Sequence, residues 1–441
     1  MLRPLLLTLT RISVLLSLLC IPLWLRLPAY PPVLTSYYVV RFVMFLPMLA
    51  AVLFWLAGGC PGLRVFAADR WRAGWAIAVL LLAGWASLSQ HWAFMERTQP
   101  DIAENAALRF MIVALFTLTA ACSGITPRAA AAALAISGIW NAALGIAQVN
   151  ANGAIGLTML GEFPYTSAGY GTSIVRAGDL VLARPYGLHP HPNIFAGVLM
   201  IGGLAASAWL VSARRWQGIM GACAVAFILY GLLVTFSRAA WGGFFVGGLA
   251  LLLFARLVLR RAALQAVALC AALCLMAGGL FVTEYGPFIA ARAGDGQEST
   301  ELRSVSDRLV FTDFAFRAIR EEPLTGIGAG NFPWRASRYL RDTFYDLRGD
   351  NVHNVYLLAW AELGTPGLAL LLAALACMTI AAVRAIRQER TAWRIALLAG
   401  GLALSAVGLL DHYPYSLLQT QTAWWVCFAL AGTSIQGVIR A

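Results

Sequence analysis

A histidine stands at the start of an apolar segment near the C-terminal end of the chain. The sequence there reads NVHNVYLLAWAELGTPGL, so His353, Asn354 and Tyr356 come at the water-facing end of a stretch suited to a membrane helix. Imidazole titrates near neutral pH and can take a proton from an attacking hydroxyl group. We therefore predict that His353 is a catalytic base and that Asn354 or Tyr356 orients it. The alternative is that His353 only caps the helix.

Further polar residues gather at the predicted outer ends of other apolar segments. The segment ARPYGLHPHPNIFAG holds Arg184, His191 and Asn193, and the turn TFSRAAWGG has Arg238 as its one charge. Arg308 begins a periodic segment ahead of the histidine. A single arginine at a membrane boundary often extends to the lipid headgroups without a further role. Several arginines on one face together with a histidine favour a functional site.

These side chains need a membrane-embedded scaffold. Of the 441 residues, 60% are hydrophobic and 12% are charged, and the mean hydropathy is +0.75. This composition excludes an ordinary soluble protein. With about 20 residues for each crossing, we predict an all-α polytopic membrane protein with about twelve transmembrane helices. The apolar stretches lie at 5–25, 37–57, 73–90, 106–122, 129–149, 193–212, 217–235, 240–258, 262–282, 355–383, 393–410 and 421–438.

The distribution of charge predicts the orientation of these helices. All 32 basic residues are arginine. The loops on the same side of the membrane as the N-terminus carry many of these arginines, whereas the only acidic residues in these loops are Asp69 and Glu389. Positive charge marks cytoplasmic loops, so both termini are predicted to be cytoplasmic. The first stretch is predicted to be a retained anchor, because no small-residue cleavage site follows it. The net charge of +12 then reflects topology and requires no nucleic-acid partner.

The sequence divides into three predicted parts. Residues 1–282 hold the first nine helices and an outer segment at 150–192 that is rich in Gly, Pro and Thr. Residues 283–352 form a large outer loop, which this topology places in the periplasm, and residues 353–441 hold the last three helices. Within the large loop the pattern predicts amphipathic helices at about 304–322 and 333–346. A helix with one apolar face would form a lid or a wall over an outer cavity.

The sequence gives no sign of a metal or another cofactor. None of the eight cysteines falls in the two long outer segments, so neither a disulfide framework nor a Cys/His zinc spacing is present there. The chain contains no Asp-x-Asp sequence. We predict no cofactor and no metal ligands.

The stretch HNVYLLAWAELGTPGL resembles the signature of the bacterial O-antigen ligase and O-antigen polymerase family. GLHPHPNIFAG, TFSRAAWGG and SDRLVFTDFAFRAIREEPLTGIGAGNF are similar to further motifs of that family and occur in the expected order. The resemblance implies a glycosyltransferase C-type membrane fold and a glycan donor linked to undecaprenyl diphosphate. It also implies a metal-independent enzyme of the bacterial inner membrane whose active site faces the periplasm.

The resemblance also implies roles for individual residues. The two essential arginines of the family map onto Arg238 and Arg308, while Arg184 and Arg41 are further candidates for contact with the diphosphate. Arginine binds phosphate oxygens bidentately and stays charged, so it suits this role. His191, Asn193, Asn354 and Tyr356 are predicted to contact substrate. Attack opposite the leaving group would invert the anomeric configuration.

Several functions remain compatible with the sequence. A ligase would move glycan to lipid A core, whereas a polymerase would extend a growing glycan, and we favour the ligase. A transporter would place polar groups near the bilayer midplane and show internal repeats, and neither is found in the sequence. A structural assembly factor would not require a cluster of arginine and histidine at one face.

Overall fold

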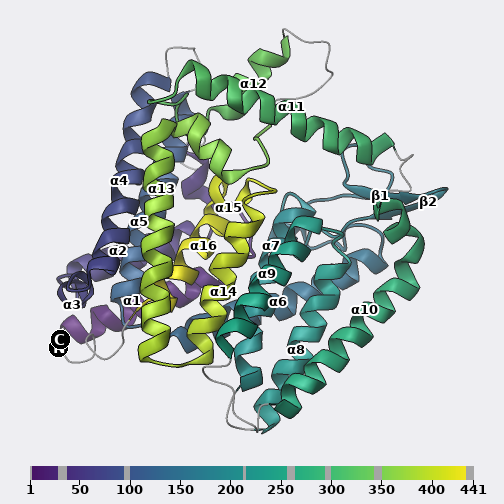
Figure 1. The fold of residues 1–441 in the computed structure, drawn as a ribbon, viewed down its shortest axis with the longest axis horizontal. Coiled ribbons are helices and arrows are strands. Elements are labelled where there is room, and N and C mark those ends of the chain that lie inside the picture. Colours follow the sequence, from purple (N-terminus) through teal and green to yellow (C-terminus); the bar gives the residue numbers. More distant parts are fainter. Residues whose placement is uncertain are drawn as a thin grey trace.

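Helices make up most of the structure, because backbone groups in hydrocarbon must form hydrogen bonds within their own segment. The computed structural model describes residues 2–27, 37–93, 100–211, 215–255, 264–293, 299–341 and 350–433. The helices form a bundle (Figure 1). They are α1 (Leu2–Leu19), α2 (Phe45–Ala57), α3 (Leu63–Ala67), α4 (Arg70–Ala93), α5 (Pro100–Cys122), α6 (Pro127–Asn150), α7 (Pro192–Ala206), α8 (Arg215–Leu233), α9 (Arg238–Ala255), α10 (Leu264–Ala293), α11 (Ser299–Glu321), α12 (Phe332–Arg341), α13 (Val355–Gln388), α14 (Ala392–Val407), α15 (Tyr413–Ser416) and α16 (Leu418–Ala431).

The helices confirm an all-α membrane protein. Each predicted span overlaps one helix. Among the described residues, eight helices are long and apolar enough to cross a membrane, and three shorter apolar helices lie at Phe45–Ala57, Arg238–Phe254 and Ala392–Val407. The count of twelve spans and the periplasmic position of the large loop stay predictions.

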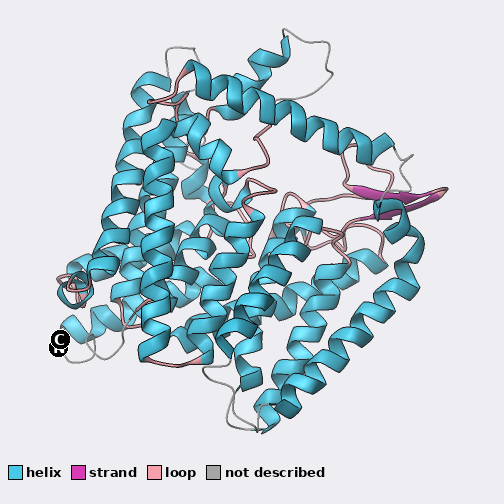
Figure 2. Ribbon diagram, viewed as in Figure 1, coloured by secondary structure: helices cyan, strands magenta, loops and turns pink. Residues whose placement is uncertain are grey.

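The structure differs from the predicted organisation in two places. The outer segment at 150–192 contains a short antiparallel hairpin of β1 (Ile174–Ala177) and β2 (Leu180–Ala183), the one sheet within the described ranges (Figure 2). The ninth predicted span does not end at residue 282, because α10 continues to Ala293 through a kink at Tyr285 and past Pro287. This extension brings the end of α10 to the hairpin.

Small residues allow some of these helices to pack closely. A methyl group added at Gly138 of α6 would lie 2.8 Å from the Cα atom of Gly202 in α7, so the two backbones touch at this point. Such small-residue contacts are a usual basis of helix association in membranes, where the hydrophobic effect gives little driving force. The close contact holds α6 against α7, whose first residues reach the candidate site.

The predicted amphipathic helices are present in the large loop. α11 corresponds to the prediction at 304–322 and α12 to the one at 333–346, of which residues 342–346 lie outside the described part. α11 runs across one end of the bundle, from the side of β1 and β2 toward α12 and α13 (Figure 1). Phe311 and Phe314 are buried, while Leu309 on another face is exposed.

A kink in α13 anchors the loop that follows α11. Gly364 interrupts α13 with a φ of +66°, a conformation that favours glycine. The amide of Thr365 donates to the carbonyl of Pro323 at 2.9 Å, and the amide of Gly328 donates to the carbonyl of Glu362 at 2.8 Å. The two segments LTGIGAG and AELGTPG are therefore joined by backbone hydrogen bonds. This contact fixes one end of α11 relative to α13 and thus to His353.

Candidate active site

A polar cavity of about 290 Å³ lies at the end of the bundle where α7 and α9 begin and α10 ends. Its described lining comes from the hairpin region, from the starts of α7 and α9, from α10 and α11, and from the turn before α13. Four guanidinium groups and two imidazoles face it, and no acidic residue belongs to the described lining. The residues that line it are Thr172, Ser173, Ile174, Arg184, His191, Asn193, Phe236, Ser237, Arg238, Ala239, Arg292, Arg308 and His353.

This cavity brings together most of the residues that the sequence singled out. The predicted site residues that line it are Arg184, His191, Asn193, Arg238, Arg308 and His353. They come from segments separated by up to 169 positions in the chain, counted from 184 to 353. A cavity with this charge is suited to an anion such as a diphosphate.

Three predicted residues do not belong to the described lining, and their contacts explain why. Arg41 donates from Nε to the carbonyl of Leu27 at 3.1 Å. Asn354 caps α13, since its Oδ1 accepts from the amides of Tyr356 and Leu357 at 2.9 and 3.0 Å. The hydroxyl of Tyr356 donates to the carbonyl of Ser405 at 3.0 Å, which turns this side chain toward α14.

The N-cap of α13 bears on the alternative that His353 only caps this helix. The cap is Asn354, whose side chain holds two amides of the first turn. Asparagine is among the preferred cap residues, because its short side chain reaches these amides without strain. The cap function is thus filled by the neighbouring residue, and His353 is left to face the cavity.

Arg184 is the buried centre of the hydrogen-bond network beside the cavity, with 4% of its surface exposed. Its guanidinium donates to the carbonyl of Thr235 at 2.7 Å, to Oγ of Ser173 at 2.9 Å and to Oδ1 of Asn193 at 2.7 Å. Asn193 in turn donates from Nδ2 to Oδ2 of Asp411 at 2.9 Å. Arg184 therefore ties together the hairpin region, the start of α7, the turn before α9 and the turn before α15.

The turn before α9 presents Arg238 and is held by Arg292. Phe236 adopts a φ of +53°, which is uncommon for a residue other than glycine and costs free energy. Nη2 of Arg292 donates to the carbonyl of Phe236 at 3.3 Å, and Nη1 of Arg238 donates to the carbonyl of Arg292 at 3.4 Å. The end of α10 thus positions the first residue of α9.

Burial keeps the two cavity histidines neutral at ordinary pH. Burial, and then the charge of Arg184, lowers the pKa of His191 to about 3. Nδ1 of His191 accepts from the amide of Asn193 at 3.1 Å, which places the ring proton on Nε2. Burial also lowers the pKa of His353, against the opposing effect of Asp411. A neutral His353 has a lone pair that can accept a proton.

The carboxyl group of Asp411 lies near the imidazoles of His353 and His412. Burial alone would raise the pKa of the Asp411 carboxyl, but His412 and the hydrogen bond from Asn193 hold it below its ordinary value. One nitrogen of His353, one of His412 and one carboxylate oxygen of Asp411 all lie within 4.8 Å of one another. These donors are of a kind that can hold a metal ion, although their spacing in the chain matches no metal-binding motif.

Arg292 lines the cavity but is not among the residues that the sequence predicts for the site. The predicted span ends at residue 282, which leaves this arginine in the predicted large loop. The apolar run TEYGPFIAARA continues past that point and could have extended the helix by two turns or more. The kink at Tyr285 and the proline at 287 disguise this continuation.

One comparison with known proteins bears on this geometry. Residues 222–372 match a family model described as O-antigen ligase. The match includes three of the four cavity arginines and one of the two histidines, namely Arg238, Arg292, Arg308 and His353. No curated protein matches the chain.

Proposed function

We propose that this chain, which belongs to the O-antigen ligase family through residues 222–372, is an inner-membrane glycosyltransferase. It moves glycan from undecaprenyl diphosphate to an acceptor hydroxyl at the periplasmic face. The observation that supports this proposal most is the cavity with four guanidinium groups, two imidazoles and no carboxylate in its described lining. Such a site fits a diphosphate with a sugar attached.

The arginines act on the leaving group. Breaking the bond between the anomeric carbon and the diphosphate oxygen leaves the electron pair and the negative charge on the diphosphate. Cations that are already fixed around that oxygen stabilise the transition state more than the ground state. Arg238 and Arg308 supply this charge, and Arg184 holds the surrounding turns in place. In this scheme guanidinium groups do what a divalent ion does in other glycosyltransferases.

His353 acts on the acceptor. The acceptor oxygen attacks the anomeric carbon opposite the diphosphate and forms the new glycosidic bond, while its proton passes to a ring nitrogen of His353. The configuration at the anomeric carbon is inverted. Asn354 does not contact the acceptor in this scheme but fixes the turn that carries His353, and Tyr356 fixes the first turn of α13 against α14.

The identity of the acceptor distinguishes an O-antigen ligase from a polymerase. We propose lipid A core as the acceptor, which makes the protein an O-antigen ligase, and keep a growing glycan, the polymerase reaction, as the alternative. A deletion strain separates the two. Loss of long surface glycan with accumulation of long lipid-linked chains supports the ligase. Single repeat units on lipid A core support the polymerase and refute the ligase.

The activity itself is tested with purified protein, a lipid-linked glycan donor and an acceptor in the presence of EDTA. Transfer without ATP or an added metal is the expected result. An absolute requirement for Mg²⁺ or Mn²⁺ would contradict the role given to the arginines.

The proposed topology has both termini in the cytoplasm and the cavity in the periplasm. A single cysteine introduced at position 350, where the native Asp350 is exposed, should react with a membrane-impermeant thiol reagent in intact spheroplasts when the native cysteines are replaced. A cysteine at position 390, in the predicted inner loop, should react only after the membrane is opened. The reverse pattern would place the cavity in the cytoplasm.

A further inference from the structure

The geometry beside the cavity points to a metal site, and we propose that His353, Asp411 and His412 bind a zinc ion that inhibits the enzyme. The three side chains come from two turns, one before α13 and one between α14 and α15. Their ligand atoms lie within 4.8 Å of one another. Around a tetrahedral zinc the ligand atoms are about 3.3 Å apart, so small side-chain movements would close the site.

His412 is arranged as a metal ligand. Its Nδ1 lies 2.7 Å from Oγ of Ser416. A proton on Nδ1 shared with this hydroxyl leaves the lone pair of Nε2 for a metal. Metal-binding histidines usually make such a hydrogen bond with their second nitrogen, which fixes the ring and its tautomer. The carbonyl of Ser416 is in turn bound by Arg109, so this support is anchored in α5.

The imidazole of His353 lies beside that of His412, and its Nδ1 has no hydrogen-bond partner within the described ranges. The two ring centroids are 5.5 Å apart and the rings are nearly perpendicular, at 81°. Nδ1 of His353 is buried and makes no hydrogen bond within the described ranges. A buried ring nitrogen without a partner is costly, and a metal ion would supply one.

Asp411 supplies the third ligand and the negative charge. Only 3% of its surface is exposed, so it is not an ordinary solvated carboxylate. Oδ1 accepts from the amide of His412 at 2.8 Å and Oδ2 accepts from Asn193 at 2.9 Å, which hold the carboxylate in one orientation. Each oxygen keeps a second lone pair for a metal.

The donor set favours zinc over harder ions. Two imidazoles and one carboxylate suit Zn²⁺ and neighbouring transition metals, whereas Mg²⁺ and Ca²⁺ prefer oxygen ligands alone. Three protein ligands leave a fourth position open. We therefore expect reversible binding of one ion.

Inhibition of transfer by bound zinc rests on the proposed function. If His353 is the base, a metal on its lone pair prevents it from taking the acceptor proton. Bound zinc then blocks transfer, and removal of zinc restores it. The binding itself does not depend on what the protein catalyses, so the two statements can fail separately.

Binding is tested on the full-length protein, purified with a tag that contains no histidine and stripped with EDTA. Zn²⁺ affinity is measured by competition with a chromophoric chelator in wild type, in His412→Gln and in Asp411→Asn. We expect one ion per protein and at least ~10-fold weaker binding in both variants, because even residues that only support a ligand typically matter this much. His91→Gln is the matched control, since His91 is an exposed histidine in the last turn of α4.

The outcomes separate the site from its effect. Wild type that binds no zinc at micromolar concentrations, or His412→Gln that binds as well as His91→Gln, overturns the site and leaves the proposed glycosyl transfer untouched. In transfer assays, added Zn²⁺ should inhibit wild type reversibly, and His412→Gln should need at least ~10-fold more zinc for the same inhibition. Full or increased transfer by the zinc-bound protein overturns the inhibition and counts against His353 as the base.

Discussion

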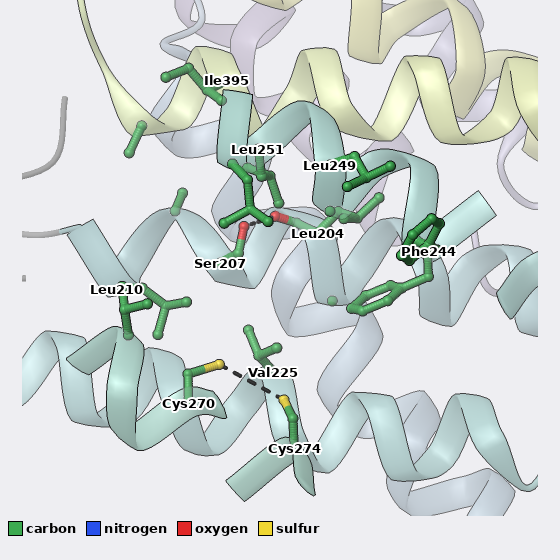
Figure 3. Close-up of a pocket in the computed structure, with 17 residues that line it drawn as sticks. Leu204, Ser207, Leu210, Val225, Phe244, Leu249, Leu251, Cys270, Cys274 and Ile395 are labelled. Atoms are coloured by element: carbon green, nitrogen blue, oxygen red, sulfur yellow. Dashed lines mark hydrogen bonds between the residues drawn. The ribbon is translucent and has the colours of Figure 1, made fainter. Parts of the chain in front are cut away.

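The same helices build two hollows of opposite character. At one end, α7, α9 and α10 contribute to the polar cavity of about 290 Å³ with its arginines and histidines. Farther along the same three helices, joined by α8 and the start of α14, lies a larger apolar hollow of about 370 Å³. Figure 3 shows it with leucines, Phe244, Val225 and Ile395 around it.

The polar groups of the apolar hollow are already engaged with the protein. Oγ of Ser207 donates to the carbonyl of Leu204 at 2.6 Å, and the sulfurs of Cys270 and Cys274 lie 3.9 Å apart (Figure 3). No charged side chain belongs to the described lining of this hollow. The polar cavity is therefore the better candidate for the site although it is smaller, because only its described lining holds cations beside imidazoles. A cavity suited to hydrocarbon accepts an acyl chain or a prenyl chain equally well.

Removing a cation from the polar cavity should have the largest effect. We expect Arg238→Ala and Arg308→Ala each to lower transfer by ~10²-fold or more, as the loss of a donor that stabilises transition-state charge usually does. Lysine should restore little, because a point charge does not replace a bidentate fork. Turnover with a lipid-linked donor measures the effect.

The control for Arg308 is Arg317→Ala on the same helix. Arg317 pairs with Glu321 at 3.0 Å and its side chain is 46% exposed, outside the cavity lining. This variant should keep nearly full activity. Equal losses for Arg308→Ala and Arg317→Ala would mean that α11 matters only as a scaffold.

Replacement of Arg292 tests whether the arginines of the polar cavity contribute equally to transfer. Arg292→Ala should lower transfer by ~10-fold, less than the loss at Arg238, since part of its hydrogen-bonding capacity holds the carbonyl of Phe236. A drop in turnover with unchanged donor binding would assign it to the transition state. No change at all would show that its cavity position is incidental.

The pH dependence tests the burial of His353. Because burial lowers its pKa, the imidazole stays neutral at pH 7, and acidification charges it only below the ordinary value of about 6.5. Turnover should thus be level around neutral pH and fall by about tenfold per pH unit below the lowered pKa. A falling limb centred above pH 7 would contradict a buried neutral base.

The smallest effect is expected in the apolar hollow. Leu249→Ala removes apolar atoms from a half-exposed side chain and leaves no polar group without a partner. Stability should change by about 0.5 kcal/mol or less, and turnover should stay within about twofold. A loss as large as that of Arg238→Ala would show that the apolar hollow takes part in the reaction.

The sequence predicts the helices well because their signal is local. Long apolar runs define each span, and Pro323 with the following glycines correctly ends α11 near residue 321. The apolar periodicity of α11 predicts its buried face only in part, because Phe311, Phe314 and Ile319 are buried whereas Leu309 and Phe316 are exposed. A short hairpin such as β1 and β2 has no comparable signal, since four residues in each strand carry little periodicity.

The sequence predicts which types of residue form the site, but it does not predict the hydrogen bonds that join them. Six of the predicted residues meet in one cavity, because the helix ends and turns that carry them lie at the same end of the bundle. The link from Arg184 through Asn193 reaches Asp411, which lies 218 positions after Asn193 in the chain. The pairing of LTGIGAG with the kink at Gly364 likewise rests on backbone hydrogen bonds that no local pattern encodes.

The central claim is that His353 takes the acceptor proton in a cavity whose arginines hold the donor. The most direct measurement compares wild type with His353→Asn for both donor binding and the rate of transfer in the same purified system. We expect near-normal binding and a rate lower by ~10²–10⁴-fold, the usual contribution of a general base. A fully active His353→Asn enzyme would exclude His353 as the base and leave the arginines as the source of catalysis.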